Sequence, residues 1–451
     1  RLKVNWQLAD NTKIKFLISQ VDLNDPADIW TIDGSLNTLS DRPGMDSQKT
    51  NSYGMKVFHS FDGFELQSYT SSTDTNVIFS YDADWGNADS HFPYVYDYFS
   101  ETLRDRKSFN QEFRIVSDSA DFQENSFFEW VIGANYLELK ESNLKKDDGL
   151  YGDPSDPYGP YASASASSSK YKSSNFSVFG NLDYLLSASL KFSIGLRWED
   201  WEADYSDSLQ ESFNPTDKMS GGKISLIKNM INDTNIYASL AKGYKQGGFN
   251  LGLGLDANAT NKNLAYDPEF LTNYELGINT KLLDSRITFN GVLFYSDRED
   301  QQVLISTQTD PSDPNTFSFL TQNAAEGVNH GLEINMDMDI NQSLSAFVNL
   351  GILKTEIKNW QSRQDLEGRA QAHAPERSYA LGLNWAPTSH TYLAIDFTGK
   401  SSFYYSDSHN NKSKSYVLTN LNLGYVKNNW NYELWARNIF DEYYSVRGFY
   451  F

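Results

Sequence analysis

Strict alternation of apolar and polar residues is the feature that most constrains the fold of this chain. In residues 332–340, Leu, Ile and Met occupy the even positions, and Glu, Asn and Asp occupy the odd ones. Residues 192–199, 274–282 and 420–425 show the same two-residue period. A helix would spread these apolar side chains around its whole surface, whereas a β-strand gathers them on one face. The sequence therefore predicts an all-β protein.

The length of the alternating runs indicates a membrane protein. Many runs extend over about 9–12 residues, whereas strands of globular proteins are mostly about 5–6 residues long. A tilted strand needs about 9–11 residues to cross a bilayer. No run of 18 apolar residues occurs, so a transmembrane helix is not expected. Tyr, Phe and Trp make up 15% of the chain, which is what aromatic girdles at the two membrane interfaces would use.

The connections between these runs alternate between short and long. Short turns such as Asp62-Gly63 and Asp284-Ser285 separate long polar segments. The long segments lie at about 23–50, 84–107, 141–174, 203–219, 247–270, 302–327 and 358–376. Outer-membrane barrels have short periplasmic turns and long extracellular loops. We therefore expect an antiparallel up-and-down transmembrane β-barrel, with residues 1–451 forming one barrel domain. The Ala/Ser run at 162–167 is expected to be a flexible part of the third long loop.

About 18 strands follow from this reading, each about one bilayer crossing long. They are expected to begin near Arg1, Ile14, Tyr53, Phe64, Ser108, Phe127, Asn175, Leu190, Gly222, Asn235, Thr272, Arg286, Val328, Leu344, Ser378, Thr391, Tyr416 and Trp430.

The alternation also predicts which side chains meet lipid and which line a wet interior. The residues expected to point outward are Phe192, Ile194, Leu196, Leu276, Ile278, Ile334 and Met336. Those expected to point inward are Arg197, Glu275, Asn279, Glu333 and Asp337.

Composition argues against several functional classes. The chain has no Cys, which removes thiolate nucleophiles and Cys-based metal sites. Its six His residues show no metal-ligand spacing, and no GxSxG nucleophile motif occurs. The net charge of −21 disfavours nucleic acid, since binding to a duplex relies on Lys and Arg that neutralise phosphates. We therefore expect no catalytic residues, no metal site, no cofactor and no nucleic-acid partner, and the protein is not expected to be an enzyme.

Two aromatic clusters supply the candidate ligand-binding residues. Tyr94, Tyr96 and Tyr98 lie in the second long connection, and Tyr404 and Tyr405 lie near the outer end of a strand. Amphipathic rings can bind a large ligand at low entropic cost. The alternative is that they belong to the extracellular aromatic girdle. The acidic loops offer a separate hypothesis, a Ca²⁺ site built from Asp22, Asp25 and Asp28.

Four stretches resemble a known family. They are Tyr237–Asn250 (YASLAKGYKQGGFN), Pro268–Gly277 (PEFLTNYELG), Phe294–Val303 (FYSDREDQQV) and Asn438–Tyr444 (NIFDEYY). In order and spacing they are similar to the barrel domain of TonB-dependent outer-membrane receptors, especially siderophore receptors. The strand pattern extends this resemblance over the whole chain.

The resemblance implies a multi-pass barrel of 22 strands in the cell outer membrane, with an N-terminal plug in its lumen. It implies energy-coupled uptake of a scarce large ligand, most often a ferric siderophore, powered by TonB through the N-terminal region. A passive porin-like channel is the alternative function. The other expected partners are outer-membrane lipid and lipopolysaccharide, and the protein is expected to be a monomer.

The ends of the chain carry a further expectation. Residues 1–6 already alternate like a strand, and only seven residues follow Tyr444. A closing strand needs about 9–11 residues. We therefore expect a barrel that lacks its plug, its first three strands and its last one, with an unpaired edge at each terminus.

Overall fold

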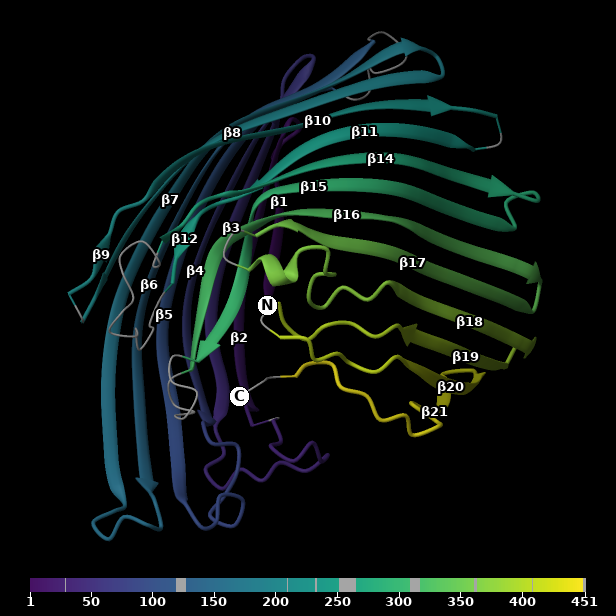
Figure 1. The fold of residues 1–451 in the computed structure, drawn as a ribbon. Coiled ribbons are helices and arrows are strands. Elements are labelled where there is room, and N and C mark those ends of the chain that lie inside the picture. The colour runs from purple at the N-terminus through teal and green to yellow at the C-terminus, as the bar shows by residue number, and fades with distance from the viewer. Residues whose placement is uncertain are drawn as a thin grey trace. The chain divides into compact units, whose positions relative to one another are not determined.

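The computed structural model is built almost entirely of antiparallel β-strands (Figure 1). It describes the whole chain except residues 29, 119–126, 209, 232, 251–264, 309–316, 361–362, 408 and 449–451. The described residues divide into two compact units. Unit 1 comprises residues 1–121, 129–180 and 197–219, and unit 2 comprises residues 122–128, 181–196 and 220–451.

Unit 1 is a meander in which each strand pairs with the next along the chain, from β1 to β6. Its strands are β1 (Leu2–Ala9), β2 (Thr12–Pro26), β3 (Met45–Ser60), β4 (Phe64–Asp82), β5 (Val95–Ser117) and β6 (Phe128–Gly152). The short strand β9 (Ser212–Phe213) pairs with the end of β8. Besides β6, whose first residue Phe128 belongs to unit 2, three strands contribute to both units, namely β7 (Tyr161–Ser187), β8 (Leu190–Asp207) and β10 (Thr216–Asn229).

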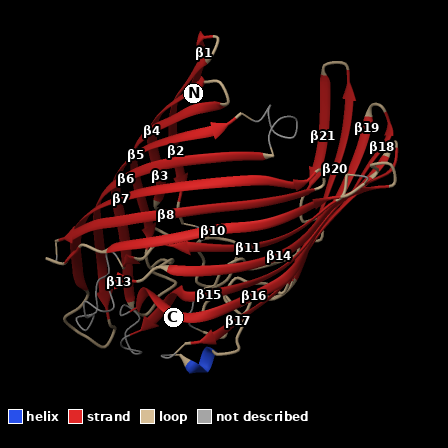
Figure 2. Cartoon of the chain, turned by 90° about the horizontal axis from the view of Figure 1, so that it is seen from above, coloured by secondary structure: helices blue, strands red, loops and turns tan. Residues whose placement is uncertain are grey.

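Unit 2 continues the same pattern from β10 to β21. Its strands are β11 (Asn235–Lys245), β14 (Glu269–Leu282), β15 (Ile287–Gln308), β16 (Phe317–Asn341), β17 (Leu344–Asn359), β18 (Arg377–Thr388), β19 (Thr391–Lys400), β20 (Tyr416–Lys427) and β21 (Trp430–Ala436). A small separate ladder joins β12 (Gly248–Phe249) to β13 (Ala265–Tyr266). One short 3₁₀ helix, η3 (Gln364–Leu366), follows β17 (Figure 2). None of the described helices has the length and apolar character needed to span a membrane.

The prediction of about 18 strands is confirmed. In the described part of the chain, eighteen strands have seven or more residues, and they occur in the predicted order. The predicted short turns are also found. At Asp62-Gly63, the glycine has φ +80°, a conformation it adopts without a Cβ penalty.

The predicted strand lengths were wrong for the strands that flank the long connections. β5, β6 and β7 contain 23, 25 and 27 residues, whereas a bilayer crossing takes about 9–11. The Ala/Ser run at 162–167, predicted to be loop, lies in β7. The reason is that backbone pairing needs no apolar pattern. Polar pairs such as Glu101 and Lys146 continue the β5–β6 ladder beyond the alternating region.

The last strand is shorter than its sequence suggests. The alternating pattern predicts a strand from Trp430 to Tyr444, but β21 ends at Ala436. Asn438 and Asp441 both have positive φ values, and the backbone N–H of Glu442 donates to Oδ1 of Asn438 at 2.9 Å. Asn tolerates this left-handed conformation and closes such turns with its side chain. The NIFDEYY stretch is therefore a turn anchored on β20, where Asn420 accepts the N–H of Asn438.

The strand register groups apolar side chains into cross-strand rows. Leu276, Leu293, Leu332 and Ile352 form one row from β14 to β17. Glu333 follows Leu332 in β16 and so lies on the opposite face. The residues predicted to point outward and inward therefore lie on opposite faces of their strands. That the apolar face meets lipid stays a prediction.

Replacing Ile334 with Arg is expected to lower the stability of the folded chain by about 2–4 kcal/mol, because it places a charge against the hydrocarbon of the bilayer. Ile334 lies between Gly291 of β15 and Leu350 of β17. The loss is measured by urea unfolding in lipid vesicles, with Glu333→Arg as the control on the opposite face. A larger loss for the control would show that the two faces have been assigned the wrong way round.

Candidate functional site

The ring of Tyr404 lies between two cationic side chains. Cζ of Arg369 is 3.9 Å from the ring centroid, and Nζ of Lys412 is 4.0 Å from it. A cation over the face of an aromatic ring is attracted by the ring quadrupole, by about 0.5–2 kcal/mol depending on solvent exposure. Isolated β-bridges also join Tyr404 to Ala372 and to Lys412. Tyr404 therefore organises a loop cluster, which we define as residues 369–373, 401–407 and 409–413 of unit 2.

Arg369 and Asp407 link the two segments of this loop cluster through hydrogen bonds. The guanidinium of Arg369 donates to the carbonyl oxygen of Ser406 and to Oδ1 of Asn410. The backbone N–H of Ala372 donates to Oδ1 of Asp407 at 2.9 Å. Burial raises the pKa of the Asp407 carboxyl, although the Ala372 N–H and the charge of Arg369 oppose the rise. The cluster is thus preorganised and holds the cations Arg369 and Lys412 together with the half-buried carboxyl of Asp407.

Further ring side chains complete the cluster. The ring of Tyr405 meets that of Phe403 edge to face, with centroids 5.9 Å apart. Phe403 is buried, and its centroid is 5.7 Å from that of His373. Burial, together with the charge of Arg369, lowers the pKa of His409. The structure therefore brings Tyr404 and Tyr405 into one cluster, but gives Tyr405 a packing role.

A buried polar network connects this loop cluster to the strands. Nε of Arg298 donates to Glu269 at 2.8 Å, and its Nη1 donates to Oε1 of Gln371 at 3.2 Å. The other carboxylate oxygen of Glu269 accepts the backbone N–H of Gln302. The N–H of Gln371 donates to the hydroxyl of Thr355 at 2.9 Å. Since buried polar groups are costly unless they are hydrogen-bonded, this network fixes the segment that carries Arg369.

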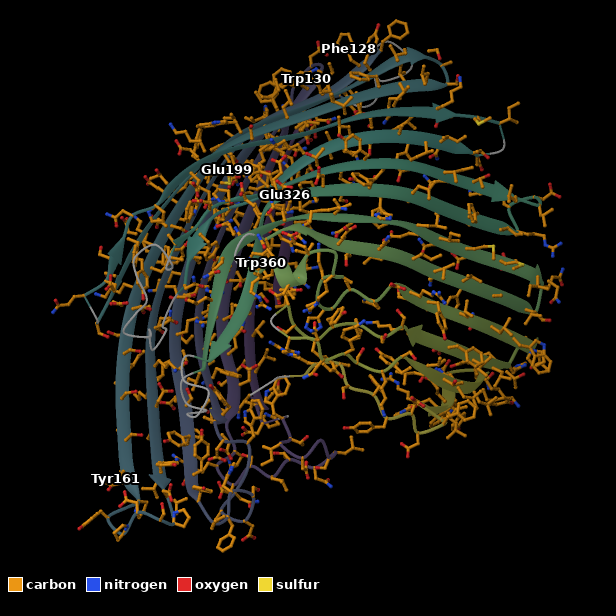
Figure 3. The ribbon with its side chains drawn as sticks, viewed as in Figure 1. Phe128, Trp130, Tyr161, Glu199, Glu326 and Trp360 are labelled. Carbon is orange, nitrogen blue, oxygen red and sulfur yellow. The ribbon has the colours of Figure 1, made fainter. Side chains whose placement is uncertain are left out.

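A small apolar core also holds that segment. Ile357, Trp360 and Leu366 are at most 2% exposed, and Val303 of β15 packs with them. Figure 3 shows Trp360 beside the short helix η3. The backbone closes around it, because Ile357 and Arg369 are hydrogen-bonded at 3.0 Å. Arg369 therefore projects from a packed structure rather than from a loose loop.

The tyrosines of unit 1 form a second, separate group. The ring centroids of Tyr96 and Tyr98 are 4.7 Å apart, and that of His91 is 5.1 Å from Tyr96. His91 lies 3.4 Å from the Asp84 carboxylate. Tyr94 is 47% exposed, and its N–H donates to the carbonyl of His91. The structure therefore brings Tyr96 and Tyr98 together and leaves Tyr94 at the tip of the connection.

Arg42 holds the first long connection of unit 1 in place. Its guanidinium forms ion pairs with Asp97 at 3.0 Å and with Asp148 at 2.7 Å. The same group lies over the ring of Phe99. Sequence reasoning did not identify Arg42, and it missed Arg369, Lys412 and Asp407 as well, because contacts between distant loops leave no local pattern.

The three aspartates of the Ca²⁺ hypothesis do not converge. Asp22 and Asp25 are three residues apart in β2, so their side chains lie on opposite faces of that strand. Asp28 instead accepts the backbone N–H groups of Gly44 and Asp82. Within the described ranges, no group of three His, Cys, Asp or Glu residues is arranged to hold a metal ion.

Comparison with solved structures gives the same fold. The ferric yersiniabactin uptake receptor of Yersinia pestis matches with a TM-score of 0.73 and 16% identity, over 98% of this chain and 65% of its own. The siderophore receptor PiuA of Acinetobacter baumannii matches with a TM-score of 0.74 and 16% identity, over 98% and 70%. The copper transporter OprC gives a TM-score of 0.72 at 13% identity, over 98% and 66%. The chain thus spans about two thirds of the length of these proteins.

The sequence itself matches a family along nearly its whole length. Residues 5–439 correspond to the family described as TonB dependent receptor-like, β-barrel. This range includes the four stretches on which the resemblance was based, except the last five residues of the NIFDEYY turn. The chain therefore belongs to the TonB-dependent receptor β-barrel family, and it is a protein of the outer membrane.

Proposed function

We propose that this chain is the barrel of a receptor that takes up a ferric siderophore, or a similar anionic metal chelate, by TonB-dependent transport. The observation that carries the proposal is the preorganised loop cluster around Tyr404, where Arg369 and Lys412 flank one aromatic ring. Its cations can attract the carboxylates or phenolates of a chelate, and its rings can pack on the ligand's apolar parts. The names of the similar structures, which include siderophore receptors and a copper transporter, support a metal complex as cargo.

The acidic charge of the chain makes cations at the binding site important for holding an anionic ligand. With a net charge of −21, the chain repels an anion at long range, although salt screens this repulsion beyond about 8–10 Å. A short-range cluster of cations is therefore needed to hold an anionic ligand. The other partners in the proposal are TonB, outer-membrane lipid and lipopolysaccharide, with the receptor acting as a monomer.

Replacing Arg369 and Lys412 together with Ala is expected to weaken binding of an anionic ferric siderophore by about 10-fold to 100-fold, because two charge-assisted contacts are lost. Tyr404→Ala is expected to weaken it by a similar factor, since the ring orders both cations. Binding of radiolabelled iron complexes to intact cells measures the effect. The panel should contain catecholate, hydroxamate and citrate complexes.

Lys427→Ala is the matched control, because Lys427 lies at the β20–β21 turn, away from this loop cluster. Unchanged affinity in the Arg369/Lys412 variant for every bound complex would contradict the proposal. Equal uptake with and without TonB would instead favour the passive channel.

A further inference from the structure

One face of β2 and β3 in unit 1 carries a group of three lysines that form no ion pair among the described residues. Lys15 of β2 and Lys56 of β3 are directly opposite each other in the ladder. Lys13 lies on the same face of β2, two residues away. Like charges that stand directly opposite on neighbouring strands are destabilising. None of the ion pairs found among the described residues includes Lys13, Lys15 or Lys56.

In another pair of opposed lysines of the same unit, each ammonium group is neutralised by a carboxylate. Lys107 and Lys140 are directly opposite each other on β5 and β6. There, Lys107 forms an ion pair with Asp74 at 3.4 Å, and Lys140 forms one with Glu138 at 2.6 Å. The contrast indicates that Lys15 and Lys56 lack the direct ion pairs that the fold supplies to an opposed lysine pair elsewhere.

Aromatic rings hold these ammonium groups without neutralising them. Nζ of Lys15 is 5.1 Å from the ring centroid of Phe58, and Nζ of Lys56 is 5.0 Å from that of Tyr69. At exposed sites such contacts contribute about 0.5–1 kcal/mol. They orient the cations along the sheet face and leave their positive charge available.

A cavity adjoins the lysines at the short-turn end of the strands. Its volume is about 310 Å³, and its lining includes Lys13, Lys15, Phe58, Gln7 and Asn11. Side-chain amides and ammonium groups supply hydrogen-bond donors there.

Two carboxylates, Asp10 and Glu65, also line this cavity. Oε1 of Glu65 already accepts a hydrogen bond from Gln67 at 2.7 Å. The lysines therefore meet no carboxylate within ion-pair distance in the described part of unit 1, in a chain whose overall charge has the opposite sign.

We propose that this face is a docking site for an acidic polypeptide segment, bound through its carboxylates. Lys13 and Lys15 are two residues apart on one strand, so they are about 6.6–6.8 Å apart along it. An extended peptide presents alternate side chains on one side at the same spacing. Acidic residues at every second position therefore match these two lysines, while Lys56 on the next strand contacts the peptide from the side. A small anion would engage only part of this row.

The test uses the full chain in detergent micelles and a labelled peptide with Glu at alternate positions. Fluorescence anisotropy should show binding that weakens with salt. The Lys15→Gln, Lys56→Gln double variant should weaken binding by at least about tenfold, since two charge-assisted contacts are lost. Lys107→Gln, Lys140→Gln is the matched control, and its affinity should stay within about twofold of the parent chain, because exposed paired charges contribute little.

Stability provides a second readout. Without peptide, Lys15→Gln, Lys56→Gln should melt at the same temperature as the parent chain or higher, because it removes like-charge repulsion. A purely structural role for the lysines would instead lower the melting temperature, which would overturn the proposal. So would equal binding of a peptide with Gln in place of Glu, an equal loss in the control variant, or complete displacement of the peptide by equimolar inorganic phosphate.

Discussion

Replacing Arg298 with Met is expected to lower the free energy of unfolding by about 3–5 kcal/mol, because it leaves the Glu269 carboxylate buried without its cation. That carboxylate is 8% exposed in the folded chain. After the replacement, the carboxylate of Glu269 still accepts the hydrogen bond from the backbone N–H of Gln302. Urea unfolding of the chain in lipid vesicles, followed by Trp fluorescence, measures the loss.

Arg286→Met is the matched control for this change. Arg286 lies in the exposed turn before β15 and donates to the carbonyl of Asp339 at 3.0 Å, so its loss is expected to cost less than about 1 kcal/mol. Glu269→Gln in the Arg298→Met background is expected to recover part of the stability, since it removes the buried carboxylate charge that has lost its cation. Equal losses for the two Arg→Met variants would show that the buried pair does not stabilise the fold.

Replacing Trp360 with Ala is expected to destabilise the segment after β17 by about 3–5 kcal/mol, through lost burial and the cavity that remains. Because Trp360 is 1% exposed, little of this cost can be relieved by solvent. The amide of Gly368, which donates to the carbonyl of Ile357 at 2.8 Å, should lose its protection from hydrogen exchange. Ligand binding should weaken as in Arg369→Ala, since Arg369 follows this segment directly.

Trp385→Ala provides the comparison for that variant, because Trp385 of β18 is 47% exposed. It removes the same side chain without touching the apolar core around Trp360. Retention of full amide protection at Gly368 in Trp360→Ala would mean that the polar network through Gln371 alone holds the segment.

The sequence predicts the strands of this fold well because one simple rule governs them. Alternation identifies each crossing, and cross-strand rows such as Leu276–Leu293–Leu332 follow once hairpin turns fix the register. The rule fails beyond the bilayer. Where β5 to β7 extend past the length of one crossing, neither face needs an apolar pattern, so the sequence no longer marks where these strands end.

The site was predicted only in part, for a different reason. The sequence pattern singled out Tyr404 as a candidate ligand-binding residue, but its partners Arg369 and Lys412 come from different segments. The Glu269–Arg298 pair also joins two of the stretches that resemble the family. Nothing in their spacing reveals it until the β14–β15 register is known, where Arg298 stands opposite Leu271.

The extension of β6 and β7 has a practical consequence for work on living cells. The connection between them is reduced to residues 153–160, and the hydroxyl and N–H of Ser155 are bonded to the Asp153 carboxylate within that tip. Exposed loop tips are where inserted sequence is best tolerated. The alternation of short and long connections predicts that this tip faces the medium, so an epitope tag placed there should let antibodies count receptors on the surface of living cells.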